Sequence, residues 1–312
     1  MISDDLVKRI NWQINLNIIG KPEKLYEASQ YLIKQGGKRI RPLLCLLSCK
    51  SAGGEIDKAL NTAVAIELIH TFTLIHDDIM DKDDLRRGVP SVHRVYGEST
   101  SILAGDLLFA KAFEICDTRV KGILSKATVE ICEGQEMDLS FELRDDVNVD
   151  EYLEMIRKKT ASLFEASTKS GAVIANADKK TIEDFANYGR NLGMAFQIYD
   201  DVLDIIGEEE KFGKPIGSDI ERGKKSIVIL KALEKLPEKE RENLKIFLRK
   251  ENSKSEIQKA IALIKSSNAI EDCKAKAKFY IDEAKKSLIN IPGSDEKKSL
   301  IGIADFVIKR EK

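Results

Sequence analysis

The chain contains no proline between Pro90 and Pro215, so long helices can run through this interval without interruption. The whole sequence of 312 residues has only 19 glycines and 6 prolines, which together fall below the average share of about 12%. Apolar residues recur at intervals of three and four, as at Leu153, Ile156 and Leu163, whereas sustained alternation is rare. The sequence therefore predicts an all-α fold.

Glycines and prolines mark the expected helix ends and divide the chain into roughly a dozen helices. These breaks fall at residues 20–22, 36–37, 53–54, 88–90, 207, 212–217, 237 and 292–293. Two helices, from residue 56 to about 81 and from 183 to about 206, are apolar on nearly every face, which predicts central positions in a bundle. From about residue 234 onward a narrower apolar stripe predicts outer amphipathic helices. Because no linker precedes this part, we expect a single domain over residues 1–312.

Charge and hydropathy exclude several classes of protein. Lysine and arginine number 51 against 52 aspartates and glutamates, so the net charge of −1 provides no bulk attraction to nucleic acid. No stretch reaches the ~18 consecutive apolar residues of a membrane-spanning helix, and the acidic N-terminus lacks the basic segment of a secretory signal. We expect a cytoplasmic protein without a transmembrane segment or a nucleic-acid partner. The five cysteines form no C-x-x-C pair and are expected to be buried thiols.

The same acidic motif, D-D-x-x-D, ends both apolar helices, at residues 77–81 and 200–204. Within each motif the first and last aspartates lie four residues apart, so both carboxylates project from one face of the helix. Like charges at a helix C-terminus repel one another and oppose the helix dipole, which a cation relieves. Carboxylate oxygens are typical ligands of Mg²⁺, which usually completes its coordination with substrate phosphates. The two motifs therefore predict a shared metal site, in which opposed acidic clusters bind a diphosphate.

Basic residues at glycine turns or beside the aspartates would complement such an anion. The segment GGKRIRP at residues 36–42 joins a turn to a helix start and presents cations beside backbone N–H groups, which favours anion binding. The segment RRG at residues 86–88 follows the first acidic motif. The segments that flank the second motif contain Lys159, Thr160, Lys214, Lys224 and Lys225.

Seven segments, in order, resemble the trans-isoprenyl diphosphate synthases, or polyprenyl synthetases, which extend an allylic diphosphate with isopentenyl diphosphate. They are GGKRIRP at 36–42, the first aspartate motif with its trailing RRG, GDLLFAKAF at 105–113, GQEMD at 134–138, KKTASLF at 158–164, FQIYDDVLD at 196–204, and FGKPIGSD followed by GKKS. The resemblance covers most of the chain. It implies an isoprenoid synthase fold, a single-domain bundle around a central cavity, and a homodimer.

The resemblance also assigns the site residues. It implies that isopentenyl diphosphate, which needs no metal, binds to Lys38, Arg41, His70 and Arg87. It implies that the allylic substrate contacts Arg86, Lys159, Thr160, Gln197, Lys214 and Lys224; among these, the catalytic residues are Lys159, Thr160, Gln197 and Lys214. The direct ligands of three Mg²⁺ ions would be Asp77, Asp81 and Asp200, supported by Asp78, Asp201 and Asp204.

The chemistry that the family implies requires no protein nucleophile. Cleavage of the allylic carbon–oxygen bond gives an allyl cation and a diphosphate, and metal ions and cationic side chains neutralise the charge that develops on this leaving group. The double bond of isopentenyl diphosphate, held in a fixed orientation, attacks the cation. Loss of a proton, for which the departing diphosphate is the expected acceptor, completes the extension.

Product length should depend on side chains below the first aspartate motif. Phe72, five residues before Asp77, matches a bulky position that family members use as a cavity floor, and Thr73 beside it is small. This combination resembles archaeal-type geranylgeranyl diphosphate synthases, which make a C20 product. Ideal helix geometry places Phe72 about 140° from Asp77, so an ordinary core position stays open for this side chain.

Other functions are also compatible with parts of the sequence. Glu67 and His70 form an E-x-x-H, which occurs in di-iron bundles, but such a site needs a second copy that His76 and His93 do not provide. A class I terpene cyclase would share the first aspartate motif but would usually lack the second one and GGKRIRP. A farnesyl (C15) or longer-chain synthase and a non-catalytic subunit of a heteromeric prenyltransferase are the alternatives that stay open.

Overall fold

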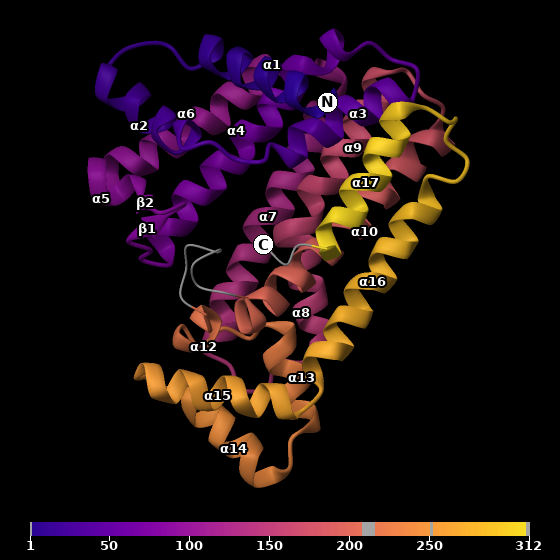
Figure 1. Cartoon of the computed structure of the whole chain (residues 1–312). Helices are drawn as coiled ribbons and strands as arrows, with labels where there is room; N and C mark the ends of the chain where they lie inside the picture. The colour runs from indigo at the N-terminus through magenta and orange to yellow at the C-terminus, as the bar shows by residue number, and fades with distance from the viewer. Residues whose placement is uncertain (1, 208–215, 250–251, 310–312) are drawn as a thin grey trace. The chain divides into compact units, whose positions relative to one another are not determined.

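The computed structural model describes residues 2–207, 216–249 and 252–309. Within these ranges the regular structure is helical except for one hairpin (Figure 1). This hairpin pairs β1 (Leu85–Arg86) with β2 (Val89–Pro90), and its loop residues Arg87 and Gly88 have positive φ angles of 54° and 76°. Two such residues in succession are typical of a tight hairpin turn. The predicted all-α fold is confirmed, and the break expected at residues 88–90 is this turn.

The described residues form more helices than the roughly dozen predicted, because short links without proline, such as residues 143–148 and 175–178, also end helices. In chain order the helical elements are α1 (Ile2–Asn17), α2 (Glu23–Lys34), α3 (Ile40–Ser51), α4 (Ile56–Met80), α5 (Val92–Tyr96), α6 (Glu98–Ile115), the 3₁₀ helix η1 (Thr118–Val120), α7 (Lys121–Glu142), α8 (Val149–Ile156), the π-helix η2 (Arg157–Ala161), α9 (Ser162–Ile174), α10 (Lys179–Ile206), α12 (Ser218–Glu221), α13 (Ile227–Lys235), α14 (Glu238–Phe247), α15 (Lys254–Ser266), α16 (Ala269–Ser287) and α17 (Asp295–Lys309). The breaks at 20–22, 36–37, 53–54, 207, 237 and 292–293 all fall between them.

The chain divides into two compact units, and each contains one aspartate motif. The first unit consists of Met1–Thr128, Leu163–Ala186 and Asn290–Leu300, and it includes residues 77–81. The second consists of Val129–Ser162, Asn187–Ile289 and Ile301–Lys312, and it includes residues 200–204. The single domain expected over residues 1–312 stays a prediction.

The core of the first unit forms around α4, which contacts α3 and α6 most extensively. Residues 63–66, 68 and 69 of this helix are fully buried, because its apolar side chains face all directions. Gly105 of α6 lies against the ring of His76, and Gly171 of α9 lies against the backbone of Cys45, where side chains would not fit. The predicted central helix at 56 to about 81 is therefore confirmed.

By length and composition alone, α4 could cross a membrane, since an 18-residue window of it has a mean hydropathy of 1.2. However, 67% of that window is buried inside the protein. A mostly buried apolar helix is what the core of a soluble protein contains, so this feature is weak evidence for a membrane span.

The core of the second unit joins α8, α10, α13 and α16. Tyr152, Ile198, Val202, Ile227 and Ala277 belong to one buried apolar cluster. Helix α15 adds a stripe of buried residues at 257, 260, 261 and 264, the spacing of a one-sided amphipathic helix. The amphipathic pattern predicted for the C-terminal part is confirmed.

Two local expectations need correction. Helix α10 begins at Lys179, four residues before the predicted start, because the carboxylate of Asp178 accepts hydrogen bonds from the backbone N–H groups of Lys180 and Thr181. Four of the five cysteines are buried as expected, whereas Cys132 is exposed. Its place on a polar face of α7 explains this, since Glu133 and Glu136 are exposed on the same helix.

Candidate active site

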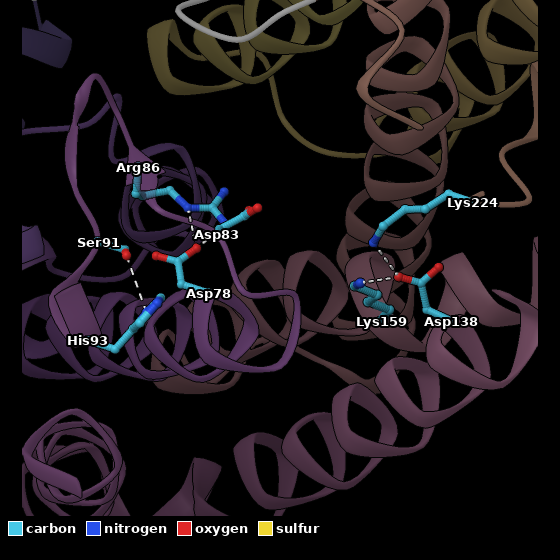
Figure 2. Close-up of polar contacts among 8 residues, drawn as sticks. All are labelled: Asp78, Asp83, Arg86, Ser91, His93, Asp138, Lys159 and Lys224. Atoms are coloured by element: carbon cyan, nitrogen blue, oxygen red, sulfur yellow. Dashed lines mark hydrogen bonds and ion pairs between the residues drawn. The ribbon is translucent and has the colours of Figure 1, made fainter. Parts of the chain in front are cut away.

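The first aspartate motif lies at the C-terminal end of α4, where Asp81 caps the helix. Asp78 is fully buried and accepts a hydrogen bond of 2.7 Å from Nε of Arg86 (Figure 2). Nη2 of the same arginine lies 3.3 Å from Oδ2 of Asp83. Although burial opposes the charge of Arg86, its hydrogen bond to Asp78 raises its pKa, so the guanidinium stays charged. Arg86 therefore reaches the motif from the hairpin, and Asp83 joins this group although no sequence signal singled it out.

The second predicted anion site lies at the start of α3. Nη1 of Arg41 is 3.2 Å from Nε2 of His70, and the guanidinium stacks 4.4 Å from the ring centroid of Phe164. Arg87 donates to the carbonyl oxygens of Leu32, at 3.2 Å, and of Gly36. These contacts place Arg41, His70 and Arg87 in one region of the first unit. Lys38, beside them in sequence, is exposed.

His70 is held in its neutral form. Burial lowers the pKa of its ring well below the ordinary value of 6.5, and the charges of Arg41 and Arg87 lower it further. An arginine can only donate hydrogen bonds, so Nε2 of the neutral ring accepts from Arg41. His70 thus orients Arg41 without cancelling its positive charge.

In the second unit, a π-helical turn positions Lys159 and Thr160. These residues lie within η2, and π-helical turns frequently occur at functional sites. Gly134 of α7 packs directly on this turn: a Cβ atom at residue 134 would lie 2.3 Å from the backbone nitrogen of Lys159. The absence of a side chain at Gly134 therefore allows α7 to approach the turn.

Lys159 and Lys224 share one carboxylate. Their Nζ atoms lie 2.6 Å and 3.1 Å from Oδ2 of Asp138 (Figure 2). Burial alone would raise the pKa of Asp138, but the two lysines outweigh burial and lower it. Asp138 therefore stays ionised and fixes both ammonium groups. The motif GQEMD contains this aspartate, but the sequence alone assigned it no role.

A cavity of about 120 Å³ in the second unit contains most of the predicted residues of that unit. It is lined by Asp138, Tyr152, Met155, Ile156, Lys159, Thr160, Gln197, Asp201, Asp219, Lys224, Lys225 and Ser226. Thr160 donates a hydrogen bond of 2.9 Å to Oε1 of Gln197. A larger cavity of about 410 Å³, beside α8, α13 and α16, contains none of the predicted residues, so size alone does not locate the site.

The second aspartate motif is anchored by protein donors. Asp201 is buried and accepts hydrogen bonds from the hydroxyl of Tyr152 at 2.5 Å, from Nε2 of Gln197 at 3.0 Å and from the backbone N–H of Ile227 at 3.1 Å. Asp204 accepts from the hydroxyl of Ser218 at 2.7 Å. Burial raises the pKa of Asp201 to about 7. Both aspartates thus have supporting contacts within the protein, and no sequence signal had pointed to Tyr152.

A family model described as polyprenyl synthetase matches residues 22–264. The chain belongs to the polyprenyl synthetase family. The short chain isoprenyl diphosphate synthase of Methanothermobacter thermautotrophicus is 47% identical over 298 residues, which cover 93% of this chain and 91% of that protein. The family resemblance seen in the sequence is confirmed.

Two crystal structures resemble this polyprenyl synthetase over nearly the whole chain. The geranylgeranyl pyrophosphate synthetase of Pyrococcus horikoshii has a TM-score of 0.92 and 41% identity, and the match covers 99% of this chain and 100% of that one. The polyprenyl synthase of Caulobacter crescentus, complexed with calcium and isoprenyl diphosphate, has a TM-score of 0.95 and 34% identity, and the match covers 100% and 96% of the two chains.

The carboxylates of this polyprenyl synthetase fit Mg²⁺ by the chemistry of the donor set. Asp77 and Asp81 in the first motif and Asp200 in the second are half-buried. Among residues 2–207, 216–249 and 252–309, no group of three or more histidine, cysteine, aspartate or glutamate side chains forms a ready-made ion site. The carboxylates of Asp77, Asp81 and Asp200 suit Mg²⁺, because this ion usually binds one or two carboxylates together with water and substrate phosphates.

The remaining predicted residues differ in what the structure says of them. Lys214 lies outside the described residues. Lys225, the extra cation of the second unit, is buried and donates to the carbonyl oxygen of Gly223 at 3.2 Å. The ring of Phe72 packs edge-to-face against Phe109, with centroids 5.4 Å apart. Thr73 donates a hydrogen bond of 2.8 Å to the carbonyl oxygen of His70.

Proposed function

We propose that this polyprenyl synthetase condenses isopentenyl diphosphate with an allylic diphosphate and gives chiefly geranylgeranyl diphosphate (C20). The observation that carries this proposal is the arginine and histidine group at the start of α3, in a chain that also has two aspartate motifs. A class I terpene cyclase would need no second diphosphate site of this kind. The geranylgeranyl pyrophosphate synthetase from Pyrococcus horikoshii, similar over the full chain, supports the C20 assignment.

We propose that Lys38, Arg41, His70 and Arg87 hold isopentenyl diphosphate without metal. The contact between Arg41 and His70, and the position of Arg87 against the carbonyl oxygen of Gly36, support this role. Arginine and lysine donate charge-assisted hydrogen bonds to phosphate oxygens, which fixes the orientation of the substrate. A fixed orientation brings its double bond to the allylic carbon and lowers the entropic part of the barrier.

We propose that the protein binds the allylic diphosphate both directly and through metal ions. The residues that contact it directly are Arg86, Lys159, Thr160, Gln197, Lys214 and Lys224. Three Mg²⁺ ions would link it to Asp77, Asp81 and Asp200, which Asp78, Asp201 and Asp204 support. Bound Mg²⁺ would neutralise negative charge on the diphosphate as its carbon–oxygen bond breaks. Lys159 and Lys224 would donate to the same oxygens, since Asp138 already fixes both ammonium groups. The amide of Gln197 links Thr160 to Asp201 and would keep that hydroxyl in place.

The expected single domain over residues 1–312, the cytoplasmic location and the homodimer belong to the same proposal. The homodimer rests on the family resemblance, the single domain on the absence of a linker in the sequence, and the cytoplasmic location on its charge and hydropathy. A sedimentation experiment that gives twice the mass of one chain would support the homodimer. A mass equal to that of one chain would contradict it.

The decisive experiment incubates the pure protein with Mg²⁺, isopentenyl diphosphate and C5, C10 or C15 allylic starters, followed by chromatography of the dephosphorylated products. We expect chiefly C20 product. Asp77→Ala and Asp200→Ala should each lower turnover by at least about a hundredfold, because charge on the leaving group is no longer neutralised. Asp84→Ala removes an exposed carboxylate that pairs with Arg94, and it should leave turnover unchanged. If the pure protein gives no product with any starter, it is a non-catalytic subunit.

The same assay tests Phe72 as the floor of the product cavity. Its ring packs on Phe109 of α6, so Phe72→Ala removes a large side chain from that contact. We expect products longer than C20 from this variant. An unchanged product distribution would make Phe72 an ordinary core residue.

A further inference from the structure

The two residues of the E-x-x-H motif in α4 each contact one arginine of the GGKRIRP segment. Glu67 and His70 lie one turn apart on α4, and Arg39 and Arg41 lie at the start of α3. Oε1 of Glu67 is 2.6 Å from Nη1 of Arg39, and Nε2 of His70 is 3.2 Å from Nη1 of Arg41. Each member of the motif therefore contacts one arginine. The proposed function gives His70 a role in substrate binding, but it gives none to Glu67.

The side chain of Arg39 is buried in the first unit, where it contacts several acceptors. Its side chain and that of Glu67 are only 2% and 3% exposed. Its guanidinium also donates to Oδ1 of Asn11 in α1 at 2.9 Å, to the carbonyl oxygen of Ile33 in α2 at 2.9 Å and to that of Gly36 at 3.4 Å. This one side chain thus ties the Gly36–Gly37 turn to three helices.

The two arginines differ in how their charge is treated. A carboxylate neutralises Arg39, so this arginine does not compete for an anion. A neutral imidazole contacts Arg41, so the positive charge of Arg41 is not neutralised and can bind an anion. Glu67 and His70, three residues apart on one helix face, therefore separate a structural arginine from a binding arginine.

We propose that Glu67 is a positioning residue for isopentenyl diphosphate: it anchors Arg39 and thereby fixes the turn from which Lys38 and Arg41 reach the substrate. This inference rests on the proposed function of Lys38, Arg41, His70 and Arg87. Without the anchor, a buried charge is left unpaired and the turn moves, which displaces Lys38 and Arg41.

The test measures steady-state kinetics of the full-length enzyme with each substrate varied in turn. We expect Glu67→Gln to raise the KM for isopentenyl diphosphate about tenfold, the weakening expected when a displaced side chain loses one hydrogen bond to the charged substrate. The KM for the allylic diphosphate should stay nearly unchanged, since only the arginine site is disturbed. Asp117→Asn, which removes the carboxylate of another arginine pair in the same unit, should change neither KM.

The variant Arg41→Ala separates failure of this inference from failure of the proposed function. It should raise the KM for isopentenyl diphosphate at least as much as Glu67→Gln does. If Arg41→Ala leaves that KM unchanged, the assignment of the isopentenyl diphosphate site is wrong. If Arg41→Ala raises it and Glu67→Gln does not, only the positioning role is wrong.

A double variant guards against loss of folding. Arg39→Met combined with Glu67→Leu replaces a buried ion pair by apolar side chains, a change that is often tolerated because no unpaired charge is left. We expect this protein to be more stable than Glu67→Gln, because no unpaired charge stays buried, while its KM for isopentenyl diphosphate stays raised. Recovery of both properties together would show that Glu67 acts through stability alone and would overturn the inference. An equal rise in both KM values would overturn it as well.

Discussion

His70 illustrates how burial and neighbouring charge decide the protonation state of one side chain. Four arginines, at positions 39, 41, 86 and 87, all lower its pKa in addition to burial. Glu67, on the same helix, forms an ion pair with Arg39. A neutral ring is therefore a property of the folded state, and the unfolded chain does not share it.

This difference gives stability a pH dependence with a defined sign. The pKa of His70 is below 6.5 in the folded protein and close to 6.5 in the unfolded chain, so the unfolded chain binds more protons in the window below pH 6.5. The free energy of unfolding should therefore be at its full value above pH 6.5 and decrease as the pH is lowered toward the folded pKa.

His70→Gln keeps an acceptor for Arg41 but cannot be protonated. Urea denaturation at about pH 7.5 and about pH 5.5 should show a smaller loss of stability on acidification in this variant than in the wild type. His93→Gln, a change at another histidine of the first unit, serves as the control. Equal losses in the wild type and His70→Gln would contradict the assignment of this pH dependence to His70.

Asp138 is a second residue whose effect can be measured alone. Because its carboxylate accepts from both Lys159 and Lys224, Asp138→Asn leaves two ammonium groups without this shared partner. We expect a loss of about 2 kcal/mol in the free energy of unfolding, as is typical for hydrogen bonds to charged groups. Chemical denaturation measures this loss. Glu136→Gln, at an exposed position on the same helix, should cost almost nothing, and an equal cost at both positions would contradict the role given to Asp138.

At the scale of an element, the π-helical turn η2 depends on a neighbouring helix. Its residues Lys159 and Thr160 contact Asp138 and Gln197, and Gly134 of α7 leaves room for the turn. A methyl group at residue 134 would collide with the backbone of Lys159. Because the collision is with backbone atoms, rotation of a side chain could not relieve it.

Gly134→Ala should therefore destabilise the protein by about 1–3 kcal/mol and raise the KM for the allylic diphosphate. Gly122 lies in the same helix, and a methyl group added there would have no atom within 4 Å, so Gly122→Ala should be neutral or stabilise by about 0.5–1 kcal/mol. Thermal unfolding and kinetics of the two variants give the comparison. The prediction fails if Gly134→Ala behaves like Gly122→Ala.

The elements differ in how well the sequence predicts them. The bounds of helix α4 follow almost to the residue from the sequence, because its apolar run ends abruptly at Asp77 and Asp78, and local sequence contains that signal. Helix α10 starts earlier than predicted because its N-cap, Asp178, precedes polar residues that carry no periodicity. The π-helical turn has no local signal, since the packing of Gly134 against it involves residues far apart in sequence.

Site residues show the same division. Arg41 and His70 could be assigned from a family motif, and the structure brings them into contact. The opposite direction of Arg39, two residues away, could not be predicted, because it follows from a positive φ of 49° and from a carboxylate on another helix. Tyr152 and Asp138 likewise acquire their roles through tertiary contacts with Asp201 and the two lysines.

At the scale of the whole molecule, a net charge of −1 conceals strong local separation of charge. The start of α3 and the hairpin gather arginines, whereas the ends of α4 and α10 gather aspartates. Each unit has a buried apolar core, and burial of apolar surface stabilises the fold. Chelation of divalent ions should therefore abolish turnover and leave the unfolding temperature nearly unchanged.

Metal and anion together should stabilise the molecule, because a ligand that binds only the folded state raises its unfolding temperature. Inorganic diphosphate with Mg²⁺ should raise this temperature more than diphosphate with a chelator does. If both aspartate motifs bind one diphosphate, Asp77→Ala and Asp200→Ala should each remove the whole Mg²⁺-dependent increment, since neither motif alone completes the coordination. If each variant removed only part of the increment, and the double variant removed the sum, the two motifs would act on separate ligands. Thermal unfolding of the three variants, with Asp84→Ala as the control, therefore distinguishes one shared substrate from two.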